Sequence, residues 1–494
     1  KMDHTSNKEG TLLSGLALSF GTTEPALRLL ISILICYPFS LLHRHYMYGK
    51  SANLQNLYFV VVGVCIGIFN YGKDVYHNIL CTVIQYMIFV VVGANKFSTV
   101  VSFIFQFGYL LIGYIYTESE LYDIKWTMPH CVLTLRLIGL SFDFYDGSRE
   151  PEKLSPQQKE SALPSRPSVL TVAGHAFFPP TYLVGPLVSM QRYQTFISGA
   201  YLRQENEAVL KASESSSGKE FIISASHPRS LEAAFKRASL GIVYMLVYVV
   251  GSLFLNDNFI LSEDFKTKSL IIKAILIGLW GKVCLSKYVS CWLLAEGACI
   301  MIGISYKGVF TPERPSSPPQ PKYDVTSNVD LYIYETSTNL QDMIVCFNTN
   351  TNAWAAQYVF KRLKFMNNKQ LSQGLTLLFL AVWHGLHSGY YASFAFEMLS
   401  VNTEREFLKL SSRYKWWTRL WSIHWIGPIK FVLLRLYSTC LLSYAITPFL
   451  LLTSAKYLSV CSSVYFYGHV LFITASLTML ASRYLARSRK PHSS

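Results

Sequence analysis

Charged residues are scarce in this chain of 494 residues: only 15% are Asp, Glu, Lys or Arg, whereas 51% are hydrophobic. A typical soluble protein carries about 25% charged residues. This deficit, together with long apolar runs that recur along the chain, excludes an ordinary soluble domain. The composition predicts an integral membrane protein with several transmembrane helices.

Signatures of several common chemistries are also missing. No Cys-x-x-Cys pair and no His-Glu-x-x-His sequence occurs, so we predict no metal site. The absence of a Gly-x-Ser-x-Gly elbow and of a Walker sequence argues against a serine hydrolase or an NTPase. Basic residues are scattered rather than arranged in stripes, and we expect no nucleic-acid partner.

Positive charge is nevertheless in excess, with 44 Lys and Arg residues against 29 Asp and Glu and a formal net charge of +15. The ordinary explanation is a set of cytosolic loops that follow the positive-inside rule and contact anionic lipid. A basic entrance that attracts a phosphorylated substrate is the alternative. The stretch 483–494 contains three arginines and a lysine, and we expect a basic tail on the cytosolic side.

Apolar segments recur often enough for roughly 11 transmembrane helices in a single integral-membrane domain over 1–494. The stretch 168–190 is interrupted by prolines and glycines, so we expect re-entrant or interfacial helices there. No internal repeat is visible, which weakens the case for a transporter built from inverted repeats. Three polar segments are predicted to be extramembrane loops: 147–168, 203–237 and the proline-rich 311–322.

One histidine lies inside these apolar runs. His384 is halfway along the run Leu371–Phe396, which is long enough to span the membrane as one helix and would place the imidazole near the bilayer midplane. Ionisable groups at that depth usually line a functional polar cavity. A structural role, in which the imidazole hydrogen-bonds across a helix bundle, fits the sequence equally well. On a continuous helix His387 would share a face with His384.

An unusual polar stretch precedes this run. Asn348, Asn350 and Asn352 stand at alternate positions ahead of a segment, Tyr358–Phe365, that interleaves aromatic and basic residues. Asparagine amides both donate and accept hydrogen bonds, so they are suited to orienting a substrate carbonyl or hydroxyl. The alternative is an Asx-capped turn that leads into a helix at the membrane interface.

These residues carry a resemblance. Trp383-His384-Gly385, followed by Gly389-Tyr390, resembles the WHGxxxGY motif of the membrane-bound O-acyltransferase family, and Asn348 stands where that family has its second signature residue. The resemblance covers nearly the whole chain. Further stretches are similar to the lysophospholipid branch of the family: 145–147, 178–186, 347–354 and 361–365. A tyrosine-rich motif of that branch is matched only in its second half, by 465–469, which leaves the role of His469 open.

The resemblance implies an all-α polytopic membrane fold, in which re-entrant and interfacial helices surround a buried catalytic chamber. It implies an enzyme of the endoplasmic reticulum, often dimeric, that transfers a polyunsaturated acyl chain from acyl-CoA to the sn-2 hydroxyl of lysophosphatidylcholine and related lysophospholipids. Acyl-CoA would be a co-substrate, and no cofactor is implied. A relative that acylates a sterol, a diacylglycerol or a protein is the alternative, and a membrane transporter is a more distant one.

The same resemblance implies roles for individual residues. His384 would be the general base, and Asn348 would position the substrate or stabilise the intermediate. Lys361 and Arg362 would contact CoA phosphates or, equally well, lipid phosphates. The remaining candidates for contact with substrate are mostly aromatic: Trp354, Tyr358, Trp383, His387 and Tyr390. Other charged residues in apolar runs would line the chamber or form structural pairs: Arg136, Lys282, Lys287, Glu296 and Arg435.

Overall fold

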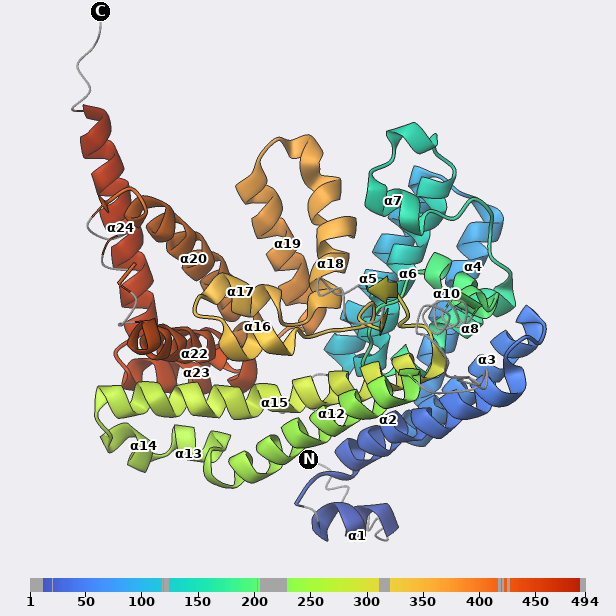
Figure 1. The fold of residues 1–494 in the computed structure, drawn as a ribbon, viewed down its shortest axis with the longest axis horizontal. Helices are drawn as coiled ribbons and strands as arrows, with labels where there is room; N and C mark the ends of the chain where they lie inside the picture. The colour runs from blue at the N-terminus through green and yellow to red at the C-terminus, as the bar shows by residue number, and fades with distance from the viewer. Residues whose placement is uncertain are drawn as a thin grey trace, which may run out of the picture. The chain divides into compact units, whose positions relative to one another are not determined.

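The computed structural model describes residues 12–19, 21–117, 119, 124–201, 203–204, 229–310, 320–415, 419, 422–423 and 427–488. Regular structure in these ranges is almost entirely helical, as predicted (Figure 1). A single antiparallel pair of strands joins β1 (Gly308–Phe310) to β2 (Gln320–Lys322) within these ranges. The strand β2 therefore occupies the end of the predicted loop 311–322, and residues 311–319 lie outside the described part.

Contacts divide the chain into two compact units, one formed by 1–117, 123–242 and 291–327 and the other by 118–122, 243–290 and 328–494. The division passes within two long helices, α12 (Arg229–Phe254) and α15 (Leu270–Ile302). The last part of the predicted loop 203–237, Leu231–Arg237, is helical and lies in the first turns of α12. Residues 205–228 of that predicted loop lie outside the described part.

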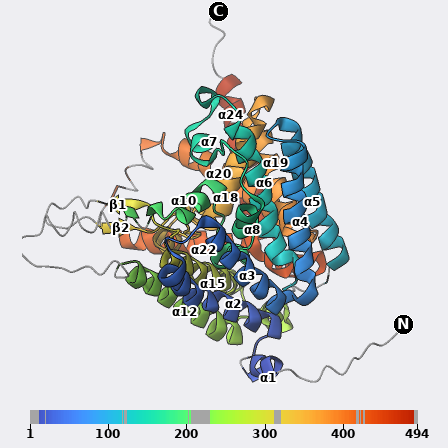
Figure 2. The same cartoon turned by 90° about the vertical axis from the view of Figure 1, so that its right-hand side faces the viewer.

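The first unit contains helices that are connected by short turns. In it α5 packs along α6 and beside α4, as Figure 2 shows, and α3 packs against α8. Gly63 permits this last approach, because a Cβ at that position would lie 1.9 Å from the Phe177 carbonyl oxygen. The elements are α1 (Leu12–Ser19), α2 (Glu24–Leu42), η1 (His43–Met47), α3 (Ala52–Tyr71), η2 (Gly72–Val75), α4 (Tyr76–Val91), α5 (Lys96–Thr117), α6 (Thr127–Gly147), η3 (Pro151–Lys153), α7 (Pro156–Ser161), α8 (Val169–Ala176), α9 (Pro179–Tyr182) and α10 (Met190–Ile197).

The stretch 168–190 is broken, as its prolines and glycines predict: α8 and α9 are short, and residues 183–189 are not helical. A buried arginine of α6 stabilises this break. Arg136 donates hydrogen bonds to the carbonyl oxygens of His175 (2.7 Å), Ala176 (3.0 Å) and Thr181 (2.9 Å). Carbonyl groups at helix ends have no partner inside the helix. Arg136 thus has a structural role in supplying those partners.

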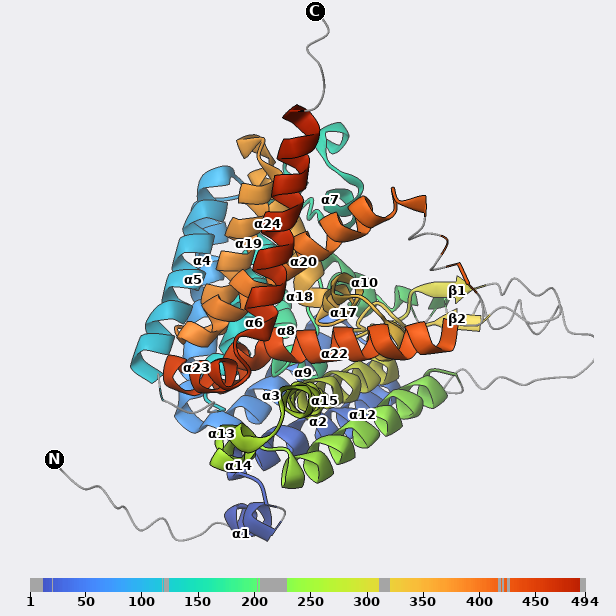
Figure 3. The same ribbon diagram turned by 90° about the vertical axis from the view of Figure 1, so that its left-hand side faces the viewer.

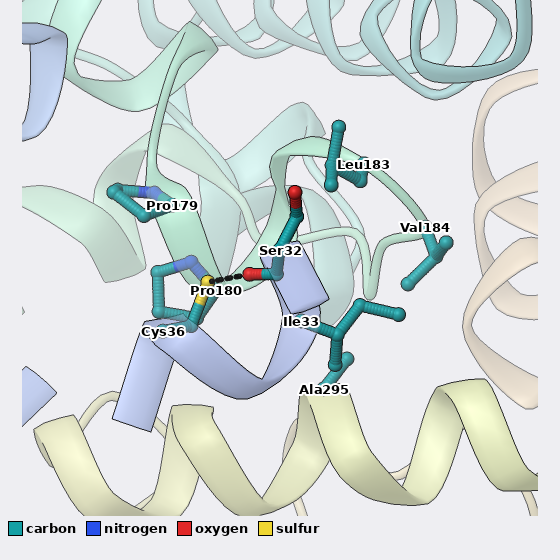
Figure 4. Close-up of a pocket in the computed structure, with 8 residues that line it drawn as sticks. All are labelled: Ser32, Ile33, Cys36, Pro179, Pro180, Leu183, Val184 and Ala295. Carbon is teal, nitrogen blue, oxygen red and sulfur yellow. Dashed lines mark hydrogen bonds between the residues drawn. The ribbon is translucent and has the colours of Figure 1, made fainter. Parts of the chain in front are cut away.

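A small cavity lies beside this broken stretch (Figure 4). Its volume of about 10 Å³ corresponds to roughly one water molecule. It is therefore too small to hold a fatty acyl chain. The lining side chains are Ser32, Ile33, Cys36, Pro179, Pro180, Leu183, Val184 and Ala295.

The second unit contains both signature residues. In it α20 packs against α22 and α24, which Figure 3 shows together. The helix α24 extends to Ser488, so the first part of the predicted tail 483–494 is helical, and residues 489–494 lie outside the described part. The elements are α13 (Asp257–Leu261), α14 (Glu263–Thr267), α16 (Leu331–Thr336), α17 (Leu340–Val345), α18 (Thr349–Tyr358), η4 (Phe360–Met366), α19 (Lys369–His384), α20 (Ser388–Ser411), α22 (Gly427–Leu451), α23 (Ser454–Ser463) and α24 (Tyr467–Ser488).

Several helical stretches in the described ranges are long and apolar enough to cross a membrane. By length and composition there are five, or six if the pair Ser454–Ser463 and Tyr467–Ser482, bent by 74°, forms one broken span. This supports a multi-pass membrane protein, and the number of roughly 11 spanning helices stays a prediction. The five are Glu24–Met47, Ala52–Val91, Lys96–Thr117, Ser230–Leu261 and Gly427–Leu451.

Candidate active site

The apolar run around His384 is two helices rather than one. The helix α19 ends at His384, and α20 begins at Ser388. Between them Gly385 has φ 138° and ψ −170°, a conformation that residues with a Cβ rarely adopt. The prediction of one continuous helix over 371–396 is therefore wrong. Because the chain turns at Gly385, His387 does not share a helix face with His384.

The second glycine of the motif allows a close approach between helices. Gly389, in the first turn of α20, packs on the end of α22, where a Cβ would lie 1.9 Å from the Pro448 carbonyl oxygen. Its backbone N–H donates to the Leu452 carbonyl at 2.9 Å. One turn later, the Ser393 hydroxyl accepts from the backbone N–H of Phe449 at 2.9 Å. These contacts fix the start of α20 against the end of α22.

Four aromatic rings surround His384. The Phe449 ring meets the imidazole edge to face at 4.9 Å between centroids, and the other three rings contact it at 4.6 to 5.7 Å: Trp383, Tyr390 and Phe394. Such packing restricts the orientation of the imidazole. His384 stays partly exposed, and no hydrogen bond joins its side chain to another residue in the described part of the chain. Within that part, no protein group occupies its ring nitrogens.

Asn348 immediately precedes α18 and has the left-handed conformation, with φ 52° and ψ 44°, which asparagine tolerates better than most residues. Its side chain does not cap the helix. The capping residue is Asn328, which is buried: its carbonyl oxygen accepts from the Thr349 N–H (3.1 Å) and its Oδ1 from the Asn350 N–H (3.0 Å). The side-chain amide of Asn348 therefore makes no hydrogen bond to the start of α18.

The third asparagine of the stretch has a separate structural role. The Asn352 amide donates to the carbonyl oxygens of Phe347 (3.0 Å) and Ile344 (3.3 Å). These bonds tie the first turn of α18 to the end of α17. The prediction that an asparagine of this stretch caps the helix in an Asx turn is therefore wrong: Asn348 makes no side-chain cap, and the distant Asn328 supplies the partner. Nothing in the sequence distinguishes Asn328 as the capping residue.

The elements α18, η4 and α19 form a hairpin whose two helices stand side by side (Figure 1). Trp354 stacks on Phe379 across the hairpin, with ring centroids 5.7 Å apart. The rise per residue of a helix places Asn348 about 9 Å from Trp354 along α18 and His384 about 8 Å from Phe379 along α19. Because the two helices are antiparallel, both displacements point to the same end of the hairpin. Both signature residues therefore lie at the same end of the hairpin.

The other predicted contact residues fall into separate places. Trp383 and Tyr390 are buried against His384, and Trp354 and Tyr358 are buried in the hairpin with their rings 5.2 Å apart. Lys361 and Arg362 lie in η4, at the end of the hairpin remote from His384. The 16 residues of α19 separate the two ends by about 24 Å. His387 follows the turn at Gly385, and its ring contacts Tyr390 at 6.1 Å.

The remaining charged residues of the apolar runs have partners. Lys282 Nζ lies 2.7 Å from Glu335 Oε1, and Arg237 Nε lies 3.1 Å from Glu296 Oε1. Lys287 Nζ lies 5.0 Å from the centre of the Tyr288 ring. Arg435 donates to backbone carbonyls of unit two, in the segment before Asn348. These contacts support a structural role for the charged residues rather than a role in lining a chamber.

His469 lies near the start of α24 and packs against α20 and α22. Its Nδ1 is 2.7 Å from the Tyr444 hydroxyl, and its ring is 4.7 Å from that of Phe396. Gly468 allows this contact, since a Cβ there would lie 2.5 Å from the Tyr444 ring. The structure thus gives His469 a place in the packing of three helices.

Known proteins align with this chain over most of its length. The model of the membrane-bound O-acyltransferase family matches residues 111–447, a range that contains Asn348 and His384. Lysophospholipid acyltransferase 5 of Homo sapiens is 39% identical over 462 residues, which cover 94% of this chain and 90% of that protein. The Rattus norvegicus protein of that name is 40% identical over 95% and 92% of the two chains, and the Drosophila melanogaster one 35% over 94% and 88%.

Proposed function

Because the chain belongs to the membrane-bound O-acyltransferase family and is therefore an acyltransferase, we propose that it acylates the free hydroxyl of a lysophospholipid. The acyl donor in this proposal is acyl-CoA, and the acceptor is the sn-2 hydroxyl of lysophosphatidylcholine or a related lysophospholipid. Relatives named for lysophospholipid acyl transfer align over nine-tenths of the chain, which supports this acceptor class over a sterol, a diacylglycerol or a protein. One structural observation carries the chemistry: the imidazole of His384 shares an end of the hairpin with Asn348.

In the proposed reaction His384 is the general base. An alcohol is a weak nucleophile at neutral pH, and a neutral imidazole accepts its proton well. The lysophospholipid oxygen attacks the thioester carbonyl carbon as its proton passes to His384. The tetrahedral intermediate then collapses, the carbon–sulfur bond breaks, and the CoA thiolate takes the proton from the imidazolium. The products are a phospholipid and free CoA, and no acyl-enzyme is formed.

Asn348 assists this reaction through its side-chain amide. The amide N–H group donates a hydrogen bond to the oxygen of the tetrahedral intermediate, or the amide orients the acceptor hydroxyl. The left-handed conformation and the capping by Asn328 support this role, because they leave the amide uncommitted to α18. The basic pair Lys361 and Arg362 lies far from His384, so it would bind phosphates only at the distant end of CoA.

The proposal also includes a cellular setting. The enzyme would reside in the membrane of the endoplasmic reticulum, with the basic stretch 483–494 in the cytosol, as the positive-inside rule favours. A preference for polyunsaturated acyl chains and a homodimeric state belong to the same proposal. Competition between saturated and polyunsaturated acyl-CoA tests the chain preference, and the mass of the purified protein in lipid nanodiscs tests the oligomeric state.

The central experiment measures phosphatidylcholine formation from lysophosphatidylcholine and labelled polyunsaturated acyl-CoA by the purified chain. Wild type is compared with His384→Ala and with His45→Ala, which alters an exposed histidine of the other unit. We expect product from wild type and His45→Ala and a loss of about 1,000-fold or more in His384→Ala, at an unchanged elution volume. Product from all three would reject His384 as the base. Its absence in all three, with product from another acceptor, would reject the lysophospholipid.

A further inference from the structure

The chain changes direction between α16 and α17, a few residues before Asn348, and we call residues 334–341 the corner. Glu404 of α20 binds the corner from one side. Glu404 is only 7% exposed. It accepts the backbone N–H of Leu340 at 2.9 Å and that of Gln341 at 3.3 Å. These N–H groups belong to the first turn of α17, where the helix supplies no acceptor. Glu404 therefore anchors α17 to α20 through charge-assisted hydrogen bonds.

Arg435 of α22 binds the backbone carbonyl groups of the same corner. Its Nη2 donates to the Tyr334 carbonyl at 2.8 Å and its Nη1 to the Ser337 carbonyl at 3.0 Å. The guanidinium is planar and rigid, so two such bonds fix the direction of the chain as well as its position. The Ser438 hydroxyl, also on α22, donates to the same Ser337 carbonyl at 3.3 Å. The corner is thus bound through its donors by one helix and through its acceptors by the other.

A tyrosine of α22 also binds Glu404. The Tyr437 hydroxyl on α22 donates to Glu404 at 3.3 Å, so α22 also contacts the carboxylate that anchors the corner to α20. Past the corner, α17 is tied to the first turn of α18 by the Asn352 amide. Hydrogen bonds therefore hold the corner to α20 and α22, and others hold α17 to the first turn of α18 across Asn348.

The same two helices also hold His384. Tyr390, at the start of α20, and Phe449, near the end of α22, both contact the imidazole. The other end of α20 carries Glu404, and the middle of α22 carries Arg435. A displacement of the corner relative to α20 and α22 would therefore move Asn348 relative to His384.

From this arrangement we propose that Glu404 and Arg435 are positioning residues, which keep Asn348 in register with His384 by fixing the corner 334–341. The inference rests on the proposed role of Asn348 in acyl transfer. The two residues act through the corner and not on the substrate. Since a displacement of about 1 Å can reduce a rate by about 100-fold, the effect falls on turnover.

The test uses the full-length enzyme with Glu404→Gln and Arg435→Gln. We expect kcat to fall about tenfold while KM for both substrates stays within about twofold. Hydrogen exchange should accelerate at the amides of Leu340 and Gln341, because the acceptor that they share loses its negative charge in Glu404→Gln and the bonds weaken. The matched control is Glu263→Gln, whose side chain in α14 is 85% exposed, and it should change neither kcat nor exchange.

A milder variant keeps the test informative if the charged residues prove necessary for folding. Tyr437→Phe removes only the hydroxyl that binds Glu404, and we expect a decrease of about two- to threefold in kcat with a smaller acceleration of exchange. Unchanged kcat despite faster exchange at the corner would overturn the inference, as would a loss explained wholly by KM.

The outcomes also separate this inference from the role of Asn348 itself. Full activity in Asn348→Ala would reject the proposed role of that residue, whatever the corner variants do. An inactive Asn348→Ala beside fully active Glu404→Gln and Arg435→Gln would reject the positioning role alone.

Discussion

His384 and Asn348 lie at the same end of one hairpin, but opposite kinds of contact hold them. Aromatic rings pack around His384, and two glycines of its motif provide a turn and a close helix contact. Hydrogen bonds from asparagine and backbone groups fix the chain around Asn348, including those of Asn328 and Asn352. The first region depends on shape and the second on polarity.

This difference follows from what each side chain is proposed to do. A general base must exchange a proton, so the contacts that orient it should not occupy its nitrogens, and ring packing satisfies that requirement. An asparagine that binds substrate must keep its amide open in a stretch of backbone that itself needs hydrogen-bond partners. Other residues supply those partners. Changes in side-chain size should therefore damage the histidine region, and loss of amide groups should damage the asparagine region.

Gly389→Ala should produce the largest effect, because it adds a methyl group where the packing around His384 leaves no space. The new Cβ would collide with the Pro448 carbonyl oxygen, so α20 must move away from α22 and carry Tyr390 with it. We expect loss of nearly all activity and a destabilisation of about 1–3 kcal/mol, measured by thermal unfolding in detergent.

The matched control for this change is Gly374→Ala in α19. A Cβ there would meet only the Met398 side chain, at 3.8 Å. Activity should be retained, and stability should rise by about 0.5–1 kcal/mol because alanine favours a helix over glycine. Equal damage from both variants would show that the contact with Pro448 is not the reason for the glycine.

Asn328→Ala should come next, because it removes an amide and adds no volume. The loss of a helix cap typically costs about 1 kcal/mol. Asn328 also fixes the backbone that presents Asn348, so kcat should fall about tenfold. Asn328→Asp keeps the acceptor for the Asn350 N–H and should restore most of the activity.

The control for this prediction is Asn368→Ala at the remote end of the hairpin. Asn368 caps α19 by accepting the Leu371 N–H at 3.0 Å. Its loss should lower stability by a similar amount and leave kcat unchanged. A comparable drop of kcat in both variants would mean that the hairpin responds to general loosening, and the special place of Asn328 would be refuted.

The two regions also differ in how far the sequence predicts them. The residues of the WHGxxxGY motif and Asn348 stand out by spacing and by family resemblance, and the predominantly helical membrane fold follows from composition. The turn at Gly385 does not, because an apolar run looks the same whether it forms one helix or two. A single glycine inside such a run has too weak a signal to predict its φ angle.

Asn328 escapes prediction for a different reason. A capping asparagine that is distant in sequence depends on the tertiary path of the chain, and no local pattern encodes that path. The same limit applies to Glu404, which no pattern in the sequence singles out, and to Arg435, whose charge in an apolar run attracts attention only as a candidate for lining a chamber or forming a structural pair. Their hydrogen bonds to backbone groups become apparent only when α20, α22 and the corner 334–341 are brought together.

Phe449→Leu should produce the smallest effect and tests whether the rings do more than fill space. Leucine preserves most of the apolar volume but removes the edge-to-face contacts with His384 and Tyr390, each at 4.9 Å. Aromatic pairs contribute about 0.5–1.5 kcal/mol beyond burial, so we expect a two- to tenfold decrease in kcat with little change in KM. Phe431→Leu, on the same helix and 45% exposed, is the control and should behave as wild type. Unchanged kcat in Phe449→Leu would mean that apolar volume alone orients His384, and the contrast between the two regions would then reduce to size against hydrogen bonding, with no part for ring geometry.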